Sequence, residues 1–219
     1  SQAITADYPE IIHSVRVNRS GAWLVKYGDI RFNEDGVLFA DSSFFSVFSY
    51  RLLRGNPKTV LVDPRSMVLT EEFAKKYFGN EDPIGKRISL EADTNLYTVT
   101  GVVQNIPGNS HIQFDMLGSL NSLRGSFSTF WISHNYYTYI VLKDGVTKEE
   151  MEAKFPELIT KYVGPQIREA IGITLEDFTK AGNQFGYELE PLKDIHLKGA
   201  PQYALEPAGS PANVYIFAV

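Results

Sequence analysis

The stretch LTEEFAKKYFGNEDPIGKRISL, from Leu69 to Leu90, predicts a helix, a stop and a strand in succession. Thr70 can cap the helix, and the two glutamates after it lie in the first turn, where the helix dipole favours negative charge. Two lysines fall in the last turn, and Gly79 can adopt the left-handed conformation that often ends a helix. The segment therefore predicts a structural joint between a helix and a strand.

One face of this predicted helix is apolar. Its residues recur at helical spacing: Leu69, Phe73, Ala74, Tyr77 and Phe78. Asn80 to Pro83 then turn the chain, and Ile88 to Leu90 have an extended pattern. We expect Phe73 and Tyr77 to be buried and Gly79 to have a positive φ.

The Gly85-Lys86 pair raises the possibility of a phosphate-binding loop, but the pattern excludes one. Five residues separate Gly79 from Gly85, where the P-loop has four, and Arg87 stands in place of the Ser or Thr that holds Mg²⁺. A P-loop also precedes its helix, whereas here the helix comes first. We expect no nucleotide binding at Gly79 to Lys86.

Composition is that of a globular protein with one large domain or two small ones. The chain has 219 residues, of which 43% are hydrophobic and 21% are charged. Its formal net charge of -5 and the lack of Lys or Arg runs argue against nucleic acid as a partner. The same charge gives it little electrostatic attraction to anionic lipid.

The chain has no cysteine, which excludes disulfides, thiolate metal sites and cysteine nucleophiles. No signal peptide opens it, and no apolar run reaches the roughly 18 residues needed to span a bilayer. Both ends have the pattern of a cut segment: Ser1 stands without a preceding Met, and Val214 to Val219 is an uncapped apolar run. That run predicts either a short strand or the start of a membrane helix.

Strands and helices interleave without a regular repeat, which predicts an α+β or mixed fold. Strands are predicted at Ile11–Val17, Ser66–Leu69, Leu96–Val103, Tyr136–Leu142 and Tyr187–Leu192. The residues from Ile30 to Leu38 predict a hairpin. Asp41 is expected to cap a short helix with these apolar residues: Phe44, Phe45, Val47, Phe48 and Leu52.

A second amphipathic helix is predicted after Asp144-Gly145. Thr147 and Glu150 form a capping box at its start. Its apolar stripe consists of Met151, Phe155, Leu158, Ile159 and Tyr162. Because Pro156 lies inside this pattern, we expect a kink or a break there.

No group of residues has the spacing of a catalytic or metal site. The four histidines, His13, His111, His134 and His196, are scattered and lack a partner ligand at helical or strand spacing. Ser110, His111 and Asp115 are the residue types of a hydrolytic triad, but no G-x-S-x-G elbow presents the serine. We predict no catalytic, cofactor-binding or metal-binding residues.

The segment FSTFWISHNYYTYIV, Phe127 to Val141, is dense in aromatic residues. Such density could form a platform on which sugars stack, but alternation along a strand favours burial of about half of it in a sheet core. An exposed remainder would indicate a protein partner.

Three segments together resemble the periplasmic core domain of MacB-type and FtsX-like ABC transporter permeases, in the style of the Bacteroidetes proteins. They are DSSFFSVFSYRLLRGNP (41–57), VLTEEFAKKYFGNEDPIGKRISL (68–90) and YTVTGVVQNIPGNSHIQFDM (97–116). DYPEI near Asp7 and YYTYIVLKDG near Tyr136 fit as well. The resemblance covers most of the chain and weakens after about Tyr162.

The resemblance implies a two-lobe α+β fold. Residues 1–57 and 112–219 would form a porter-like lobe, and residues 58–111 an inserted, smaller β-rich lobe often called the sabre. The helix of the opening stretch would then pack on a small sheet of the inserted lobe. One membrane helix would precede Ser1 and another would begin within Val214 to Val219, so that the start and end of the chain, near Gln2 and Tyr215, would lie close together.

The resemblance also implies a non-catalytic role. ATP would be hydrolysed by a cytoplasmic ATPase subunit or domain, and this periplasmic domain of an inner-membrane protein would pass the motion to partners in export, efflux or substrate extraction. Expected partners are the ATPase through the membrane helices, a second permease copy and a periplasmic adaptor or outer-membrane protein. An extracytoplasmic ligand- or peptide-binding sensor is the alternative; an enzyme is the third reading.

Overall fold

The computed structural model describes residues 2–91, 94–195 and 205. The chain divides into two compact units. The first unit comprises Ser1–Phe127 and Tyr136–Val141, and the second comprises Ser128–Asn135 and Leu142–Val219. The α+β fold expected from the sequence is confirmed, since helices and strands both contribute and the sheet is mixed.

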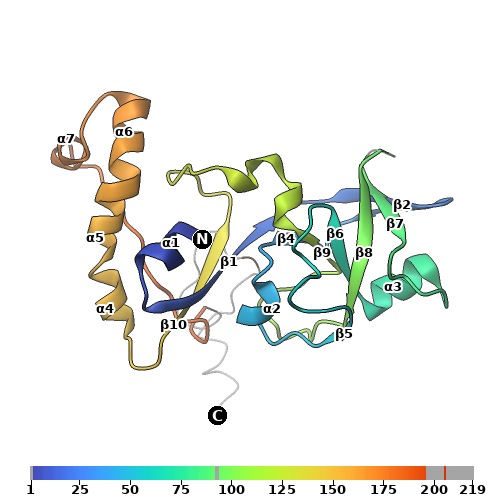
Figure 1. Cartoon of the computed structure of the whole chain (residues 1–219). Helices are drawn as coiled ribbons and strands as arrows, with labels where there is room; N and C mark the ends of the chain where they lie inside the picture. Colours follow the sequence, from blue (N-terminus) through green and yellow to red (C-terminus); the bar gives the residue numbers. More distant parts are fainter. Residues whose placement is uncertain (1, 92–93, 196–204, 206–219) are drawn as a thin grey trace, which may run out of the picture. The chain divides into compact units, whose positions relative to one another are not determined.

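A mixed sheet forms the body of the first unit (Figure 1). Its strands follow the spatial order β10-β1-β4-β9-β6-β8-β7-β2-β3, and β5 also pairs with β8. They are β1 (Ile11–Arg19), β2 (Trp23–Tyr27), β3 (Ile30–Glu34), β4 (Val37–Ala40), β5 (Leu52–Arg54), β6 (Ser66–Thr70), β7 (Arg87–Leu90), β8 (Leu96–Val103), β9 (Met116–Ser119) and β10 (Tyr137–Leu142). The pairs β4–β9 and β6–β8 are parallel, and the other described neighbours with a recorded register are antiparallel.

The opening stretch folds as predicted. Helix α3 (Glu71–Phe78) follows β6 directly, and the Thr70 hydroxyl accepts a hydrogen bond from the backbone N–H of Phe73 at 3.3 Å. Gly79, at φ 60°, ends the helix. Phe73 and Tyr77 are 4% and 2% exposed, which confirms that the aromatic face is buried. The helix packs on β6 and β8.

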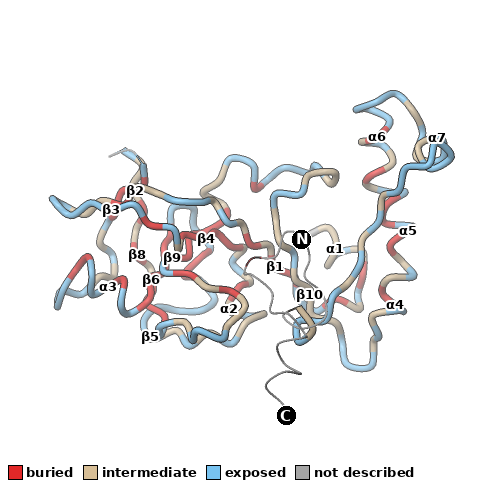
Figure 2. The backbone as a smooth tube through the Cα atoms, turned by 180° about the vertical axis from the view of Figure 1, so that it is seen from behind, coloured by how far each residue is buried: buried red, intermediate tan, exposed pale blue. Residues whose placement is uncertain are grey.

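The core of the first unit lies between α3 and the sheet. Figure 2 shows buried backbone concentrated along the central strands β4, β6, β8 and β9. The largest fully buried side chains there include Phe39, Met67, Leu69, Ile88 and Leu90. A separate aromatic group surrounds Phe44, which stacks on Tyr50 at 5.4 Å and meets Phe114 edge-on at 5.9 Å.

The predicted hairpin from Ile30 to Leu38 is wrong. The hairpin joins β2 to β3 instead, through the two-residue turn Gly28-Asp29, in which Gly28 has φ 58°. Glycine at the first position of a two-residue turn gives the backbone twist that antiparallel strands need. β4 follows β3 in the chain but pairs with β1 and β9 instead of β3.

The predicted cap by Asp41 is also wrong. Helix α2 (Phe44–Val47) starts after Ser43, and Leu52 lies in β5 rather than in the helix. The backbone carbonyl of Asp41 accepts from Phe44 N–H, but its carboxylate accepts from Arg16. A charged partner from a distant strand therefore replaces the local capping bond.

Helices dominate the second unit. They are α4 (Lys148–Glu152), α5 (Phe155–Leu158), a π-helical turn η3 (Ile159–Val163), α6 (Gly164–Ile171) and α7 (Leu175–Lys180). The Thr147–Glu150 capping box is present, and the helix breaks just before Pro156, as predicted. The strand predicted at Tyr187–Leu192 is wrong, because Leu189 N–H donates to the Glu152 carboxylate at 2.6 Å rather than to a neighbouring strand.

The remaining elements are short. Helix α1 (Gln2–Asp7) precedes β1, and the 3-10 turns η1 (Leu120–Ser122) and η2 (Arg124–Phe127) follow β9. Strands of the predicted inserted segment, 58–111, pair with strands outside it, since β6 pairs with β9 and β7 with β2. The division into lobes at 58 and 111 stays a prediction. Val214 to Val219, and with them the expected closeness of Gln2 and Tyr215, lie outside the described residues.

Candidate functional site

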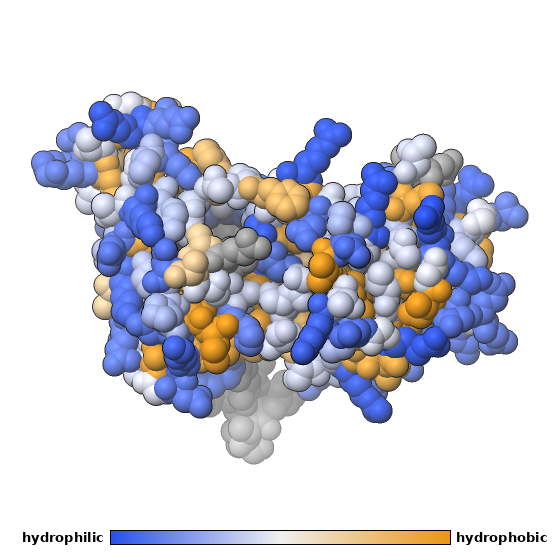
Figure 3. Space-filling view, viewed as in Figure 1, coloured by the Kyte–Doolittle hydropathy of each residue, from blue (hydrophilic) through white to orange (hydrophobic). Residues whose placement is uncertain are grey.

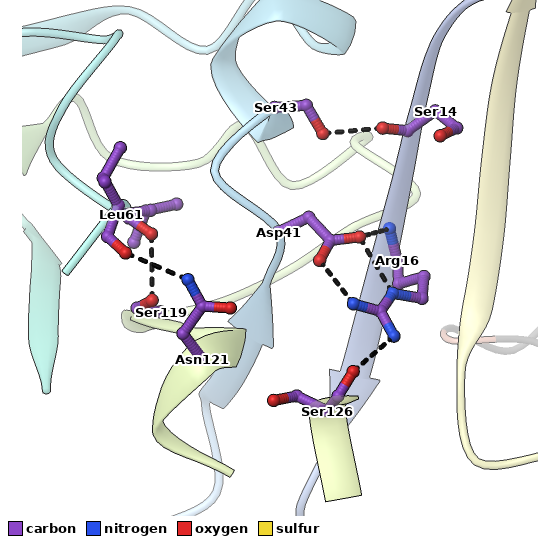
Figure 4. Close-up of polar contacts among 9 residues, drawn as sticks. Ser14, Arg16, Asp41, Ser43, Leu61, Ser119, Asn121 and Ser126 are labelled. Atoms are coloured by element: carbon purple, nitrogen blue, oxygen red, sulfur yellow. Dashed lines mark hydrogen bonds and ion pairs between the residues drawn. The ribbon is translucent and has the colours of Figure 1, made fainter. Parts of the chain in front are cut away.

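An ion pair between Arg16 and Asp41 closes the ladder between β1 and β4 (Figure 4). Arg16 donates from its backbone N–H and from Nε to one carboxylate oxygen, at 2.9 Å and 3.0 Å, and from Nη2 to the other at 2.9 Å. Asp41 N–H in turn donates to the Arg16 carbonyl at 3.1 Å. The Asp41 carboxylate thus accepts the backbone N–H of Arg16 just past the end of β4, where a strand carbonyl would otherwise accept it.

The same guanidinium reaches two more parts of the first unit. Nη1 donates to the Ser126 carbonyl at 2.8 Å, and the guanidinium carbon lies 5.2 Å from the centre of the Tyr136 ring. Ser126 and Tyr136 lie on either side of Ser128–Asn135, the segment that belongs to the second unit. We call Arg16, Asp41, Ser126 and Tyr136 the Arg16 clamp. It contacts the chain just before it leaves the first unit, at Ser126, and where it re-enters that unit, at Tyr136.

Smaller polar contacts fix the neighbouring segments in Figure 4. Ser43 Oγ donates to the Ser14 carbonyl at 2.6 Å and so ties the start of α2 to β1. Ser119 Oγ and Asn121 Nδ2 donate to the carbonyls of Leu61 and Val62, at 2.9 Å and 3.0 Å. These bonds satisfy backbone carbonyls of β1 and of the loop that precedes β6, which is a structural role.

A second charged group connects α3 to the end of β3. Glu34 is 7% exposed, and one of its oxygens accepts from the Tyr77 hydroxyl at 2.6 Å and from Lys76 Nζ at 2.7 Å. Burial, and then the hydrogen bond to Glu34, raise the pKa of the Tyr77 hydroxyl above its ordinary value. Burial and the negative charge of Glu34 likewise raise the pKa of Asp115. The buried carboxylate is paired and hydrogen-bonded, as a buried charge must be.

Several polar groups of the Gly79–Lys86 segment, the joint between α3 and β7, bond within the protein. Lys86 Nζ donates to the Glu81 carboxylate and, at 3.3 Å, to the Tyr27 hydroxyl. Gly85 N–H is used in a hydrogen bond to the Val99 carbonyl at 2.8 Å. The Lys86 ammonium and the Gly85 N–H therefore both donate to groups of the protein itself.

Ser110, His111 and Asp115 do not form a triad. Ser110 Oγ lies 2.7 Å from the Tyr50 hydroxyl, and His111 Nε2 lies 3.0 Å from the Tyr139 hydroxyl. The backbone N–H of Asp115 donates to the Gly36 carbonyl at 2.8 Å, and its carboxyl feels the charge of Glu34. Ser110 and His111 thus each have a partner other than the two that a triad requires.

Within residues 2–91, 94–195 and 205, no group of three or more His, Cys, Asp or Glu residues could hold a metal ion. His13 is exposed, and His134 stacks on Phe185 with ring centres 6.4 Å apart. His196 lies outside the described residues.

The aromatic segment from Phe127 to Val141 is less buried than its pattern predicts. None of its residues is fully buried, and Phe127 and Phe130 are 73% and 53% exposed. Several of its rings have ring partners, among them Trp131, which stacks on Tyr162 of the second unit with ring centres 4.5 Å apart. Sheet core is thus the wrong reading for this segment, because only its last residues enter the end strand β10.

Sequence reasoning missed the Arg16 clamp and the exposed edge of the β2–β3 hairpin. Asp41 and Arg16 are 25 residues apart, and no local pattern relates them. The Tyr27-Gly28-Asp29-Ile30 turn was the available signal for the hairpin, since a Gly-Asp pair between two apolar-polar runs is typical of a two-residue loop.

The described residues thus form an α+β fold with ordered polar contacts, and the face drawn in Figure 3 is mostly hydrophilic with scattered hydrophobic residues. Residues 2–158 match the MacB-like periplasmic core domain, and the chain belongs to that family. It is therefore the periplasmic or extracellular domain of a MacB-type ABC transporter permease, and domains of this kind are not enzymes. In the described part of the chain, no helix is long and apolar enough to cross a membrane.

Two solved structures are similar to the chain. One is a domain assigned to a permease protein from Porphyromonas gingivalis, with 26% sequence identity, a TM-score of 0.66, and coverage of 74% of this chain and 75% of that one. The other is the periplasmic region of MacB from Actinobacillus actinomycetemcomitans, with 15% identity, a TM-score of 0.50, and coverage of 84% and 82%. At that identity the second shows the fold alone. A comparison with curated proteins finds no match.

Proposed function

We propose that this domain passes ATP-driven motion from the membrane helices of its permease to extracytoplasmic partners. In this role an ATPase subunit or domain acts through the membrane helices, a second permease copy supplies the opposing domain, and an adaptor or outer-membrane protein receives the motion. The process served is export, efflux or extraction of a substrate. Membership of the MacB-like family supports the proposal.

The observation that carries it is the continuity of the first unit's sheet. Hydrogen-bonded neighbours connect β1 to β3 without a gap, through β4, β9, β6, β8, β7 and β2. The Arg16 clamp fixes β1 to Asp41, to Ser126 and to Tyr136. Close-packed interiors have low compressibility and transmit strain, so a displacement of β1 is carried across the unit.

We also propose the lobe division as part of this function. Residues 1–57 and 112–219 form the porter-like lobe, and residues 58–111 form the smaller inserted lobe. Helix α3 and the strands β6, β7 and β8 all lie within 58–111 and supply most side chains of one apolar core, to which β2, β4, β9 and Leu120 add the rest, and this supports treating that segment as a folding element.

The test uses the full-length permease, freed of reactive cysteines, in lipid nanodiscs with its ATPase. Because the present chain has no cysteine, Asn80→Cys adds a single site for a spin label on an exposed residue just after α3. The label-to-label distance between two permease copies is measured by pulsed electron resonance, without nucleotide and with ATP and vanadate. The proposal expects the distance distribution to shift on ATP trapping.

Arg16→Met in the same background is the matched variant. It is expected to broaden the distribution and reduce the ATP-dependent shift while ATP hydrolysis continues. An unchanged distribution on ATP trapping would contradict motion transfer. A shift produced by a periplasmic extract fraction in the absence of nucleotide, with none produced by ATP, would favour the sensor reading instead.

A further inference from the structure

The sheet of the first unit ends at β3. In the described part of the chain β3 pairs with β2 alone, and its first four residues are exposed. An edge strand presents unpaired backbone groups that can accept a strand from another chain, and proteins commonly block such edges with charged side chains, Pro, bulges or covering segments. Residues Ile30 to Glu34 contain no Pro, and their pairing with β2 is regular.

The turn geometry shows which backbone groups face outward. Tyr27 and Ile30 flank a two-residue turn, so they exchange hydrogen bonds, and this pattern repeats at every second residue of an antiparallel ladder. Ile30, Phe32 and Glu34 therefore direct their N–H and C=O groups toward β2. Arg31 and Asn33 direct theirs outward, ready for an added strand.

One face of the edge is apolar and held in place. Ile30 and Phe32 lie on that face and are 37% and 49% exposed. The Phe32 ring meets Tyr77 edge-on at 6.3 Å, and Lys76 Nζ lies 4.7 Å from the ring centre. Because Glu34 fixes Lys76 at 2.7 Å, the ring is positioned before anything binds, which lowers the entropy cost of covering it.

The other face of the edge is basic. Arg31 lies directly opposite Lys26 in the ladder, and like charges in directly opposed positions repel. Arg31 forms no ion pair with any described residue. A carboxylate placed opposite Arg31 by an incoming strand would offset this repulsion, whereas a basic residue there would increase it.

We propose that β3 is the docking edge for an extended segment of a partner protein, which adds to the sheet as an antiparallel strand. Its residues opposite Ile30 and Phe32 are apolar, and its residue opposite Arg31 is acidic. Backbone bonds to Arg31 and Asn33 hold it in register, and the alternating side chains give specificity. This deepens the partner engagement proposed above and rests on it for its biological setting.

The probe is the acetylated, amidated peptide KTVEV, whose residues lie opposite Glu34 to Ile30 in antiparallel order. It is titrated into the isotope-labelled chain and followed by amide chemical shifts. The Arg31 and Asn33 amides should shift and gain protection from hydrogen exchange. The peptide KTVKV, with Lys opposite Arg31, should bind at least about fivefold more weakly, as expected for the loss of one charge-assisted contact.

Two variants test separately the backbone hydrogen bonds and the charge contact that the proposal assigns to peptide binding. Asn33→Pro removes an outward N–H and leaves the ladder to β2 intact, a position that natural edge strands allow for proline. It should weaken KTVEV binding about fivefold or more. Arg31→Glu should reverse the preference toward KTVKV. Lys58→Glu makes the same change in net charge at an exposed residue outside β3 and should leave both affinities unchanged.

Equal affinity for the two peptides, or unchanged KTVEV affinity in Asn33→Pro with its fold intact, would overturn the proposal. A concentration-dependent dimer that Asn33→Pro abolishes would also overturn it, since it would assign the edge to a second copy of the chain. The titration needs neither ATP nor membrane. Its failure is therefore distinguishable from failure of the motion measured with the Asn80→Cys label.

Discussion

Removal of one member of the Arg16–Asp41 pair should destabilise the first unit at least as much as removal of both. The two side chains are 16% and 14% exposed, so the pair is largely desolvated. Breaking a buried ion pair costs about 3–5 kcal/mol, because it leaves a charge without its partner. The residual exposure allows some rescue by water, so we expect about 3 kcal/mol for Arg16→Met and for Asp41→Leu.

The double variant Arg16→Met/Asp41→Leu leaves neither charge behind. Replacement of a buried pair by apolar residues of similar volume is often neutral or stabilising. Here Arg16 N–H also loses the carboxylate acceptor at 2.9 Å and Ser126 loses a donor at 2.8 Å, which costs about 1–3 kcal/mol. The double variant should therefore be no less stable than either single variant, and its cost should fall well short of their sum.

The two tryptophans allow a unit-specific assay. Trp23 lies in the first unit and Trp131 in the second, and these are both of the Trp residues in the chain. In a Trp131→Phe background, fluorescence during urea unfolding reports the first unit alone, which avoids treating two units as one transition. Single variants within about 0.5 kcal/mol of the parent, the range of ordinary surface changes, would refute the reasoning. So would a double variant whose cost equals the sum.

Three further results are expected. Phe73→Ala should cost the first unit about 3–5 kcal/mol in the same urea assay, because the side chain is 4% exposed and its loss leaves a cavity; a change near zero would show that the site collapses around the gap. Asp115→Asn should raise the free energy of unfolding at neutral pH. The pKa of the Asp115 carboxyl is raised in the folded protein, so the free energy of unfolding of the parent falls as pH rises from the ordinary pKa to the folded one. A plot of the free energy of unfolding against pH, between about pH 3 and pH 8, should therefore be flatter for the variant. Calorimetry with Mg-ATP should show no binding heat for the parent or for Lys86→Ala, and saturable binding lost in that variant would contradict the joint assigned to Gly79–Lys86.

Local sequence patterns predicted the elements whose determinants are local. The helix after β6 has its cap at Thr70, its stop at Gly79 and its apolar face within ten residues, and all three appear in the structure. The Thr147–Glu150 capping box and the break before Pro156 are of the same kind. Each depends on contacts one or two helical turns apart.

Predictions failed where a distant partner decides the outcome. Asp41 has the position of a helix cap, but the Asp41 carboxylate accepts three hydrogen bonds from Arg16, one from its backbone N–H and two from its guanidinium. Tyr187 to Leu192 had the alternation of a strand, but a strand needs a neighbour, and Glu152 takes the Leu189 N–H instead. The aromatic run that ends at Val141 reached only the last strand of the sheet, where burial is partial.

Helix α3 connects the stretch that decides the fold with the edge proposed to bind a partner. Its buried side, with Phe73 and Tyr77, fixes the helix on the sheet, while its rim presents Lys76 to Glu34 and Phe32. Glu34 is 7% exposed and needs such a partner, since a buried carboxylate without a donor is strongly unfavourable. The same pair that satisfies this charge also orients the exposed aromatic ring of β3. A variant that disrupts the packing of α3 should therefore change the position of the Phe32 ring on β3 as well as the core. The geometry of the proposed docking edge thus depends on the packing of this helix.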